Sequence, residues 1–246
     1  MPYTYEYPRP SVTVDCVIFG FDLEAENGLQ VLLIRRGNEP FKGRWANPGG
    51  FVEVSDDEDQ GESLDEAARR ELEEETGIKV AYLEQLYTFG TPGRDPRGRV
   101  ITVAYVALVQ RQDYRITAGS DAAEAAWFPV KDALEGVLGI LAFDHREILK
   151  LALERLRSKV RYAPIGFNLL PRRFTFGDLR KLYETLLDRP INVSNFRKKV
   201  TKTLIETGIL QKTDELRRGQ HRPAPLYGFN RHAYAKALKS GFHFDI

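Results

Sequence analysis

The chain has 246 residues, of which 42% are hydrophobic and 29% are charged, ordinary values for a globular protein. Its one cysteine, Cys16, excludes an intrachain disulfide, and no apolar stretch approaches the ~20 residues that a membrane-spanning helix needs. The first ten residues lack the apolar core of a signal peptide, so we expect a cytoplasmic protein with no membrane attachment.

Charge is distributed unevenly along the chain. Residues 1–150 contain 16 basic and 27 acidic residues, a net charge of −11, whereas residues 151–246 contain 20 basic and 8 acidic residues, a net charge of +12. This asymmetry predicts two domains with different partners, which we place at residues 1–160 and 161–246. An acidic domain suits the binding of cations, and a basic domain suits a polyanion.

The first domain is predicted to mix strands and helices without a regular alternation. Apolar runs predict strands at 11–21, 29–35, 80–90, 99–110 and 127–130. A Glu-rich segment and an amphipathic segment from Phe143 onward predict two helices. This order indicates an α+β fold, or a sandwich built on a mixed sheet.

The second domain begins with the pattern of two short helices. Thr175 and Asp178 have the spacing of a capping box, which predicts the start of the first helix. Asn192 or Ser194 can cap the second helix, which runs to about Thr207. Two short strands, ILQKT and APLYGF, follow on either side of the basic tip RRGQHRP.

The Glu-rich helix carries the clearest chemistry. A capping box and a C-terminal glycine bound it at residues 63–77. Glu71, Glu74 and Glu75 are three and four residues apart, which places them on one helix face. Their repulsion is offset by a hard cation, and Mg²⁺ prefers carboxylate oxygens. A solvated acidic surface is the alternative, but the Gly-Gly turn and the Arg70–Glu71 pair favour a site.

This segment resembles the Nudix box, whose pattern is Gly, five residues, Glu, seven residues, Arg-Glu, an apolar residue, any residue, Glu-Glu, any residue, Gly and an apolar residue. The matching residues are Gly50, Glu62, Arg70, Glu71, Leu72, Glu74, Glu75, Gly77 and Ile78. The first gap departs from the pattern, because eleven residues separate Gly50 from Glu62. The six extra residues fall within 54–60, in the loop before the helix, where an insertion affects access to the site.

The resemblance implies functions for the matching residues. The implied ligands of Mg²⁺ (or Mn²⁺) are Gly50, through its backbone carbonyl, and Glu71, Glu74 and Glu75, which would thereby act in catalysis. The bound metal would activate water for attack on a pyrophosphate. Glu62 and Arg70 would form a structural salt bridge.

The sequence offers two candidates for the general base. Glu124 is the first candidate, because SDAAEAAWFPV predicts a loop before a strand and places this residue in the loop. Asp121 is the second candidate. Both residues are equally consistent with ordinary surface carboxylates.

Three other segments, FGTPGRDPRGRVITVAYVAL, AAEAAWFPV and LAFDHREIL, resemble the branch of the family that acts on or senses ADP-ribose. Arg94 or Arg97 is a candidate for binding a phosphate or terminal sugar of such an effector, and each is equally consistent with an exposed turn residue. Trp45 and Phe41 are candidates for stacking on a base. Burial of these two rings beneath the Gly-Gly loop is the interpretation we favour.

The basic half has the outline of a winged helix-turn-helix, in which the second helix enters the major groove of DNA. Phe196, Val200 and Leu204 follow helical apolar spacing and leave the intervening basic residues outside. The candidate DNA-binding residues are Arg197, Lys198, Lys199 and Lys202 on the helix and Arg217, Arg218 and Arg222 on the wing. A solvated basic surface is the alternative, but clustering on these two elements favours double-stranded DNA.

The combination of both halves resembles the Nudix-related transcriptional regulators of the NrtR type. The segments that carry this resemblance are FNLLPRRFTFGDLRKLYETLLDRPINVSNFRKKV and GQHRPAPLYGF. It implies a homodimeric repressor of NAD-metabolism genes that senses ADP-ribose or a related nucleotide. Because the box carboxylates are present, a Mg²⁺-dependent pyrophosphatase that gives AMP and ribose 5-phosphate is the alternative. A sensor of a sugar, with the box as scaffold, is the third hypothesis.

Overall fold

The computed structural model describes residues 6–25, 28–55, 61–114, 122–218 and 223–242. Contacts divide the chain into two compact units. The first unit consists of the residues up to Gly20, Gln30–Val109 and Asp113–Ala152, and the second consists of Phe21–Leu29, Gln110–Gln112 and Leu153–Ile246. The domain boundary at residue 160 stays a prediction.

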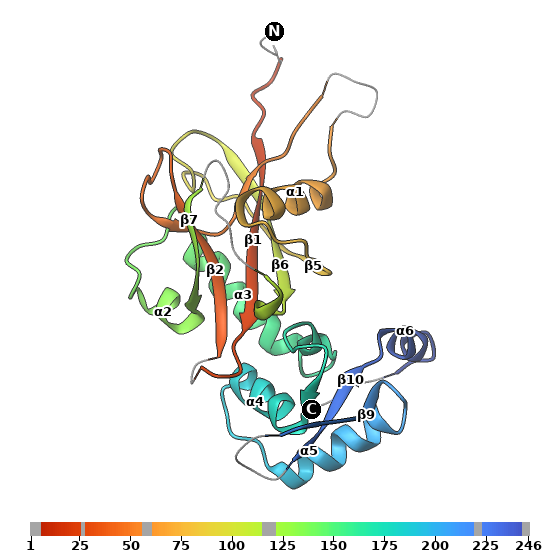
Figure 1. Ribbon diagram of the computed structural model, residues 1–246. Helices are drawn as coiled ribbons and strands as arrows, with labels where there is room; N and C mark the ends of the chain where they lie inside the picture. Colours follow the sequence, from red (N-terminus) through yellow and green to blue (C-terminus); the bar gives the residue numbers. More distant parts are fainter. Residues whose placement is uncertain (1–5, 26–27, 56–60, 115–121, 219–222, 243–246) are drawn as a thin grey trace. The chain divides into compact units, whose positions relative to one another are not determined.

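The first unit is built on a seven-stranded sheet (Figure 1). Its strands are β1 (Ser11–Phe21), β2 (Leu29–Arg36), β3 (Trp45–Ala46), β4 (Gly49–Phe51), β5 (Tyr82–Phe89), β6 (Val100–Val109) and β7 (Ala122–Pro129). The order is β3-β2-β1-β6-β5, with β4 paired to β1 and β7 paired to β2. Because β1 and β6 run parallel and the β5–β6 and β2–β7 pairs run antiparallel, the predicted mixed sheet is confirmed.

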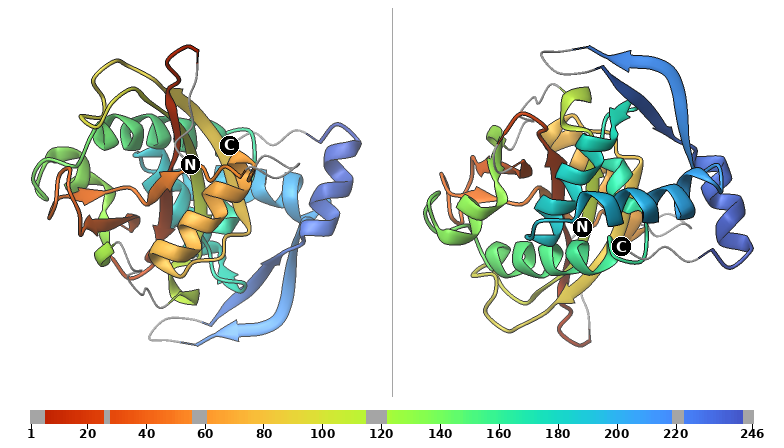
Figure 2. Two further views of the ribbon diagram at one scale, coloured as in Figure 1. Left: turned by 90° about the horizontal axis from the view of Figure 1, so that it is seen from above. Right: turned by 90° about the horizontal axis from the view of Figure 1, so that it is seen from below.

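Helices cover both faces of this sheet. The helices are α1 (Leu64–Thr76), α2 (Val130–Glu135) and α3 (His145–Lys159). In Figures 1 and 2, α1 lies on one face and α3 begins on the other. Ala67, Ala68 and Leu72 of α1 are fully buried in one core with alternate residues of β1 and β6. Both central strands are buried along most of their length, as expected for strands covered on two sides.

The second unit contains a three-stranded sheet of order β8-β10-β9 and a set of short helices. Its elements are the 3₁₀ helix η2 (Ile165–Asn168), β8 (Phe174–Thr175), α4 (Phe176–Leu187), α5 (Val193–Val200), the π-helical turn η3 (Thr201–Ile205), β9 (Leu210–Arg217), β10 (Ala224–Phe229) and α6 (Arg231–Lys239). The 3₁₀ turn η1 (Arg111–Asp113) spans a boundary between the units, because Gln110–Gln112 belong to the second unit and Asp113 begins a segment of the first. Leu182, Tyr183 and Val200 are fully buried and join α4 to α5 in the core of the predicted winged helix.

The structure corrects several expected elements. The strand expected at 127–130 is β7, which begins at Ala122, and Val130 already starts α2. The second helix of the basic half ends at Val200 as an α-helix and continues as η3. Hydroxyls of Thr203 and Thr207 there donate to backbone carbonyls four residues earlier, so they compete with regular helical bonding. The structure also contains α2, α6, β3, β4 and β8, for which the sequence carries no clear pattern.

Candidate ligand site and nucleic-acid interface

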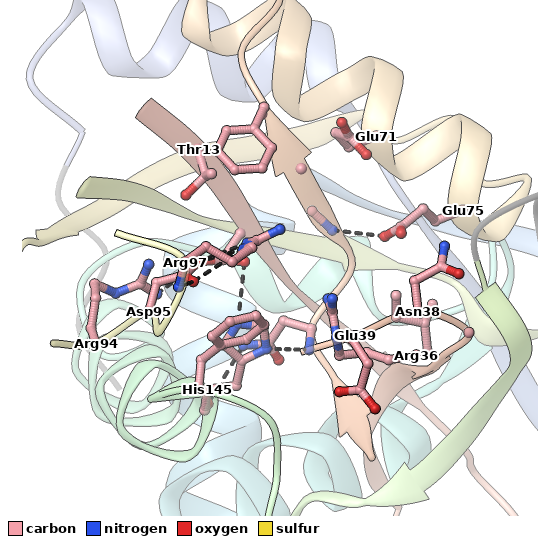
Figure 3. A pocket seen from close by; sticks show the side chains of 18 residues that line it. Thr13, Arg36, Asn38, Glu39, Glu71, Glu75, Arg94, Asp95, Arg97 and His145 are labelled. Carbon is pink, nitrogen blue, oxygen red and sulfur yellow. Dashed lines mark hydrogen bonds and ion pairs between the residues drawn. The ribbon is translucent and has the colours of Figure 1, made fainter. Parts of the chain in front are cut away.

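Helix α1 presents its carboxylates to a pocket because its other face is apolar and buried. Ser63 caps the helix in a capping box with Glu66, and Gly77 ends it in the left-handed conformation at φ 72°. The buried side chains of Ala67, Ala68 and Leu72 pack the helix on the sheet, so the side chains of Glu71 and Glu75 line a cavity of about 250 Å³ (Figure 3). Figure 3 shows both carboxylates projecting from the helix toward this cavity.

Arg70 connects the helix to the loop that precedes it. Its Nη2 and Nε atoms donate to the two oxygens of Glu62 at 2.7 and 3.0 Å, and Nη2 also donates to the carbonyl of Phe51 at 3.0 Å. Its Nη1 atom donates to Glu71 at 2.8 Å and to Glu74 at 3.1 Å. The hydrogen bond from Arg70 lowers the pKa of Glu62. The structure therefore contains the Glu62–Arg70 ion pair, with Arg70 also bound to two box carboxylates.

The three box carboxylates lie in different surroundings. Burial is the main cause that raises the pKa of Glu71, and it raises the pKa of Glu75 to about 8. The backbone N–H of Gly49 donates to Glu75 at 2.8 Å. The side chain of Glu74 is 59% exposed and pairs with Arg70 at 3.1 Å. Glu71 and Glu75 thus face the cavity, whereas Glu74 does not line it.

Gly50 is required by the close approach of helix α1 to strand β4. A Cβ atom at this position would lie 2.1 Å from Oε1 of Glu71, far inside van der Waals contact. The absence of a side chain lets the Glu71 carboxylate lie against the backbone of Gly50. This juxtaposition suits a hard cation, because carboxylate and carbonyl oxygens are the ligands that Mg²⁺ prefers. Among the described residues, however, no group of three His, Cys, Asp or Glu side chains is placed to hold a metal.

The floor of the cavity is a buried network around His145. The backbone N–H of Asn47 donates to Nδ1 of His145 at 2.8 Å, so the ring proton resides on Nε2, which lies 3.3 Å from Oδ1 of Asp15. Burial acts to raise the pKa of Asp15, but His145 and Arg94 together hold this pKa below its usual range. This arrangement keeps the Asp15 carboxylate charged at the base of the pocket.

Both arginines predicted to bind an effector line the cavity, but each already has a carboxylate partner. The Arg94 side chain is only 4% exposed, donates to both oxygens of Asp144 at 2.6 and 2.9 Å, and lies 3.4 Å from Asp15. Arg97 is 40% exposed and pairs with Asp95 at 2.7 Å. Its guanidinium lies over the ring of Phe51, 4.8 Å from the centroid. Their function in effector binding stays a prediction.

The structure corrects the setting of Glu124. This residue lies within strand β7, not in a loop before a strand, and it pairs with Arg35 of β2 beside a register shift. Its carboxylate is half-exposed, 3.7 Å from Arg35, and does not line the cavity. Asp121, the second candidate for the general base, lies outside the described residues.

The two aromatic rings considered for base stacking pack against other rings. Trp45 meets Phe128 edge-on at a centroid distance of 4.7 Å, and Phe41 meets Phe143 edge-on at 4.9 Å. Of these four rings, Phe143 lines the cavity. Packing within the protein is thus the observed environment of Trp45 and Phe41.

The basic residues of α5 and η3 form an exposed surface, which we call the basic helix face. Arg197, Lys198 and Lys202 are exposed, Lys199 is partly buried, and Phe196 is buried beneath them. This surface is consistent with contact to phosphates, because long cationic side chains on one helix neutralise them together.

The wing residues have different environments. Arg217 pairs with Asp178 at 2.7 Å, and Asp178 is also part of the capping box of α4. Arg218 is exposed, and Arg222 lies outside the described residues. The wing is therefore anchored to the first helix of the winged helix by one of the arginines predicted to bind DNA.

Among the helices of the described residues, none is long and apolar enough to cross a membrane.

Comparisons with known proteins match both halves of the chain. A family model described as NUDIX domain matches residues 9–152, and one described as NrtR DNA-binding winged helix domain matches residues 166–229. The chain belongs to the Nudix family, in its NrtR-type form. It is 38% identical over 224 residues to the "ADPR responsive transcriptional repressor NtrR" of Acinetobacter baylyi, covering 91% of this chain and 84% of that protein.

Solved structures match the same NrtR-type organisation. Shewanella oneidensis NrtR complexed with a 27mer DNA matches with a TM-score of 0.76 and 35% identity, covering 95% of this chain and 97% of that one. The NUDIX domain of the same protein complexed with ADP ribose matches with a TM-score of 0.52 and 38% identity, covering 61% of this chain and 90% of that one. The predicted fold, a Nudix sandwich followed by a winged helix, is confirmed.

The sequence patterns did not identify most of the residues that line the Nudix pocket outside α1. These are Asp15, Arg36, Asn38, Glu39, Asn47, Asp95, Phe143 and His145. One signal was available, because Asp15 is an isolated acid in the apolar run VTVDCVIFGF, and such a residue needs a buried partner. Its partners His145 and Arg94 are distant in sequence, so their pairing depends on the folded sheet.

Proposed function

We propose that this protein is a transcriptional repressor that binds DNA through its winged helix and responds to ADP-ribose in its Nudix pocket. The observation that carries the proposal is the match of both domains, in the same order and over almost the whole chain, to an ADPR-responsive repressor and to a DNA-bound NrtR. The expected targets are NAD-metabolism genes. Binding of ADP-ribose weakens the repressor–DNA complex.

The proposed DNA contact is the basic helix face, with the wing on neighbouring backbone phosphates. Helix α5 is short and amphipathic, with Phe196 and Val200 packed inward, so its basic side chains are presented together. In a winged helix-turn-helix this second helix lies in the major groove. The proposed homodimer would place two such helices on two half-sites of an operator.

The proposed effector site is the cavity beside α1. Glu71 and Glu75 would hold Mg²⁺ or Mn²⁺ together with the carbonyl of Gly50, and Glu74 would join them after leaving Arg70. Bound metal would supply positive charge for the diphosphate and activation of water. The raised pKa values of both cavity-lining carboxylates support this assignment, because a cation there would remove the free-energy cost of their buried charges.

The test uses DNA that the full-length protein selects from a random pool. Binding of a labelled selected fragment is measured by fluorescence anisotropy while ADP-ribose is added, with and without Mg²⁺. We expect ADP-ribose to release the fragment, and AMP at the same concentration to have a much smaller effect. If ADP-ribose binds in calorimetry and DNA affinity stays constant, the regulatory proposal is wrong.

Hydrolysis of ADP-ribose is the second candidate function, because Glu71 and Glu75 both face the cavity. Attack of water on the diphosphate would give AMP and ribose 5-phosphate, and Glu124 or Asp121 stays the predicted general base. The experiment measures release of AMP from ADP-ribose with Mg²⁺, for the natural protein and for Glu75→Gln. Release that is lost in the variant would establish an enzyme. Binding of ADP-ribose without release would assign the cavity to sensing alone.

A further inference from the structure

The first turn of α4 contacts both elements that are proposed to bind DNA. Phe176, the first residue of this helix, meets Phe196 of α5 edge-on at a centroid distance of 5.5 Å and Tyr227 of β10 edge-on at 6.3 Å. Two residues later, Asp178 pairs with Arg217 at the end of β9. The turn itself contains no basic residue, so any part that it takes in DNA binding is indirect.

Phe176 also contacts a basic side chain of α5. The guanidinium of Arg197 lies over the Phe176 ring, 5.1 Å from its centroid. An aromatic ring attracts a cation through its face but carries no net charge, so the contact restrains the guanidinium without neutralising it. A guanidinium that stacks by its plane still has N–H groups along its edge, which can donate to phosphate oxygens. Arg197 is exposed, so its charge remains available on the basic helix face.

Asp178 holds Arg217 in a different way. The Nη1 atom of Arg217 lies 2.7 Å from Oδ2 of Asp178 and donates to Oδ1 at 2.9 Å. Oδ2 also accepts the backbone N–H of Thr175 at 2.7 Å, within the capping box of α4. The helix cap thus fixes the carboxylate, which offsets the charge of Arg217. A phosphate contact by Arg217 would leave Asp178, whose side chain is only 13% exposed, without its cation.

We infer that Phe176 and Asp178 are positioning residues for DNA binding, one for α5 and one for the wing. Phe176 orients Arg197 for contact with a backbone phosphate. Asp178 anchors Arg217, which sets the direction of the wing and does not bind phosphate. The phosphate contact of the wing is the adjacent, exposed Arg218, because successive residues of an extended chain point to opposite sides. This inference rests on the proposed function and assigns separate roles to residues of its DNA-binding surface.

The first experiment separates the two arginines of the wing. Anisotropy titrations of the full-length protein with its selected DNA fragment, at several salt concentrations, compare Arg217→Met with Arg218→Met. Loss of a phosphate contact makes the slope of log affinity against log salt shallower by about 0.9, which we expect for Arg218→Met. Arg217→Met should weaken binding about threefold with the slope unchanged, because the wing still reaches its phosphate but must be ordered on binding. A slope shallower by about 0.9 in Arg217→Met would overturn its role as an anchor.

A double-variant cycle with Asp178→Asn tests the same role without the salt slope. The amide oxygen of Asn can still accept the backbone N–H of Thr175, so the cap is retained while the ion pair is lost. If Arg217 acts through Asp178, Arg217→Met has a smaller effect on DNA affinity in the Asp178→Asn protein than in the natural one. If Arg217 binds phosphate, Asp178→Asn frees it for that contact. A larger effect of Arg217→Met in the Asp178→Asn protein would therefore overturn the inference.

Hydrogen exchange without DNA measures the anchor by itself. Arg217→Met and Asp178→Asn should each lower amide protection in β9 and β10, since either change removes the pair that holds the wing to α4. Unchanged protection in both variants would overturn the anchor. Lowered protection in a chain that selects no DNA from the random pool would retain the anchor and overturn the repressor proposal alone.

The second cycle tests Phe176 with Phe176→Leu, which retains an apolar side chain but removes the aromatic face. We expect this change to weaken DNA binding about threefold in the natural protein and to have little effect in the Arg197→Met protein. Lys198→Met is the matched background, because Lys198 is adjacent on α5, exposed and of the same charge, and there the effect should persist. Phe176→Tyr keeps the aromatic face and should bind DNA as the natural protein does. Equal effects of Phe176→Leu in the two Met backgrounds would show that the ring only supports the fold, and would overturn its positioning role.

Discussion

The charged side chains of the Nudix domain and of the winged helix are placed in opposite ways. In the Nudix domain, the buried side chains of Arg94 and His145 both contact the buried carboxylate of Asp15 at a cavity. In the winged helix, Lys198 and Lys202 are exposed to solvent. The net charges of the two halves nearly cancel, so the total of +1 conceals two different uses of charge.

This difference determines how each domain should respond to the loss of a charge. A buried charge depends on its few partners, so removing one group leaves the others desolvated and unpaired. An exposed basic residue contributes its own share to DNA affinity, because each phosphate contact releases counterions independently. The affinity therefore depends on the sum of these contributions. We therefore expect single changes in the Nudix domain to affect stability, and changes on the basic helix face to affect DNA affinity and its salt dependence.

The largest expected effect is that of Arg94→Met. The substitution leaves Asp15 and Asp144 without their shared cation, and breaking a buried ion pair in this way costs about 3–5 kcal/mol. Urea unfolding at neutral pH measures the change. Arg97→Met is the matched control, because its more exposed side chain should cost about 1 kcal/mol or less. Equal unfolding midpoints for the two variants would contradict the expectation that loss of the more buried arginine costs more stability.

Glu75 should make the stability of the metal-free protein fall with rising pH. Its pKa is about 8 in the folded protein against an ordinary value of 4.5, so between these values the folded state retains a proton that the unfolded state releases. The free energy of unfolding is therefore highest below pH 4.5 and falls as the pH rises to about 8. The slope is at most about 1.4 kcal/mol per pH unit. Urea midpoints from pH 5 to 9 measure this slope.

Glu75→Gln should reduce that slope, because the amide has no proton to lose. Glu73→Gln is the control, since Glu73 is on the same helix but half-exposed and paired with Lys79. Saturating Mg²⁺ should also reduce the slope, because a cation favours the charged form of Glu75. A stability that rises from pH 5 to 8 in the metal-free natural protein would contradict the assigned environment.

On the basic helix face, Lys198→Ala combined with Lys202→Ala should weaken DNA binding about tenfold. The slope of log affinity against log salt should become shallower by about 2, since each lost phosphate contact removes about 0.9. The control is Lys236→Ala with Lys239→Ala on α6, which removes the same charge from another exposed helix. Anisotropy titrations at several salt concentrations give both values. If both double variants change the slope equally, only net charge matters and the face is not the contact.

Local sequence patterns predicted the helical elements well because their causes are local. The capping box of Ser63 and Glu66 and that of Thr175 and Asp178 are both present, and Gly77 has the expected left-handed conformation. The spacing of the box carboxylates followed from the helical period alone. Strands of two or three residues, such as β3 and β4, carry no such pattern, so their existence depends on pairing partners elsewhere in the chain.

The residues that line the cavity outside α1 were not predictable for the same reason. His145 meets Asn47 across 98 positions of sequence, and Arg94 meets Asp15 across 79. Nothing in the sequence shows that Arg94 and Arg97 are paired with carboxylates, because ion pairing is decided by the folded loops. The misplacement of Glu124 has a related cause, since its alanine-rich neighbourhood has weak strand propensity and becomes β7 through pairing with β2.

The sequence left two candidates for the cap of α5, and the structure identifies one of them. The side chain of Asn192 accepts a hydrogen bond from the N–H of Asn195 at 3.0 Å, whereas Ser194 lies within the helix. Asn192→Ala should therefore destabilise α5 by about 1 kcal/mol and lower amide protection across the helix about fivefold, while Ser194→Ala should change it little. Hydrogen exchange measures this locally, without requiring the two domains to unfold together. Equal loss of protection in both variants would contradict the assignment of Asn192 as the cap of α5, the helix that supplies the basic helix face.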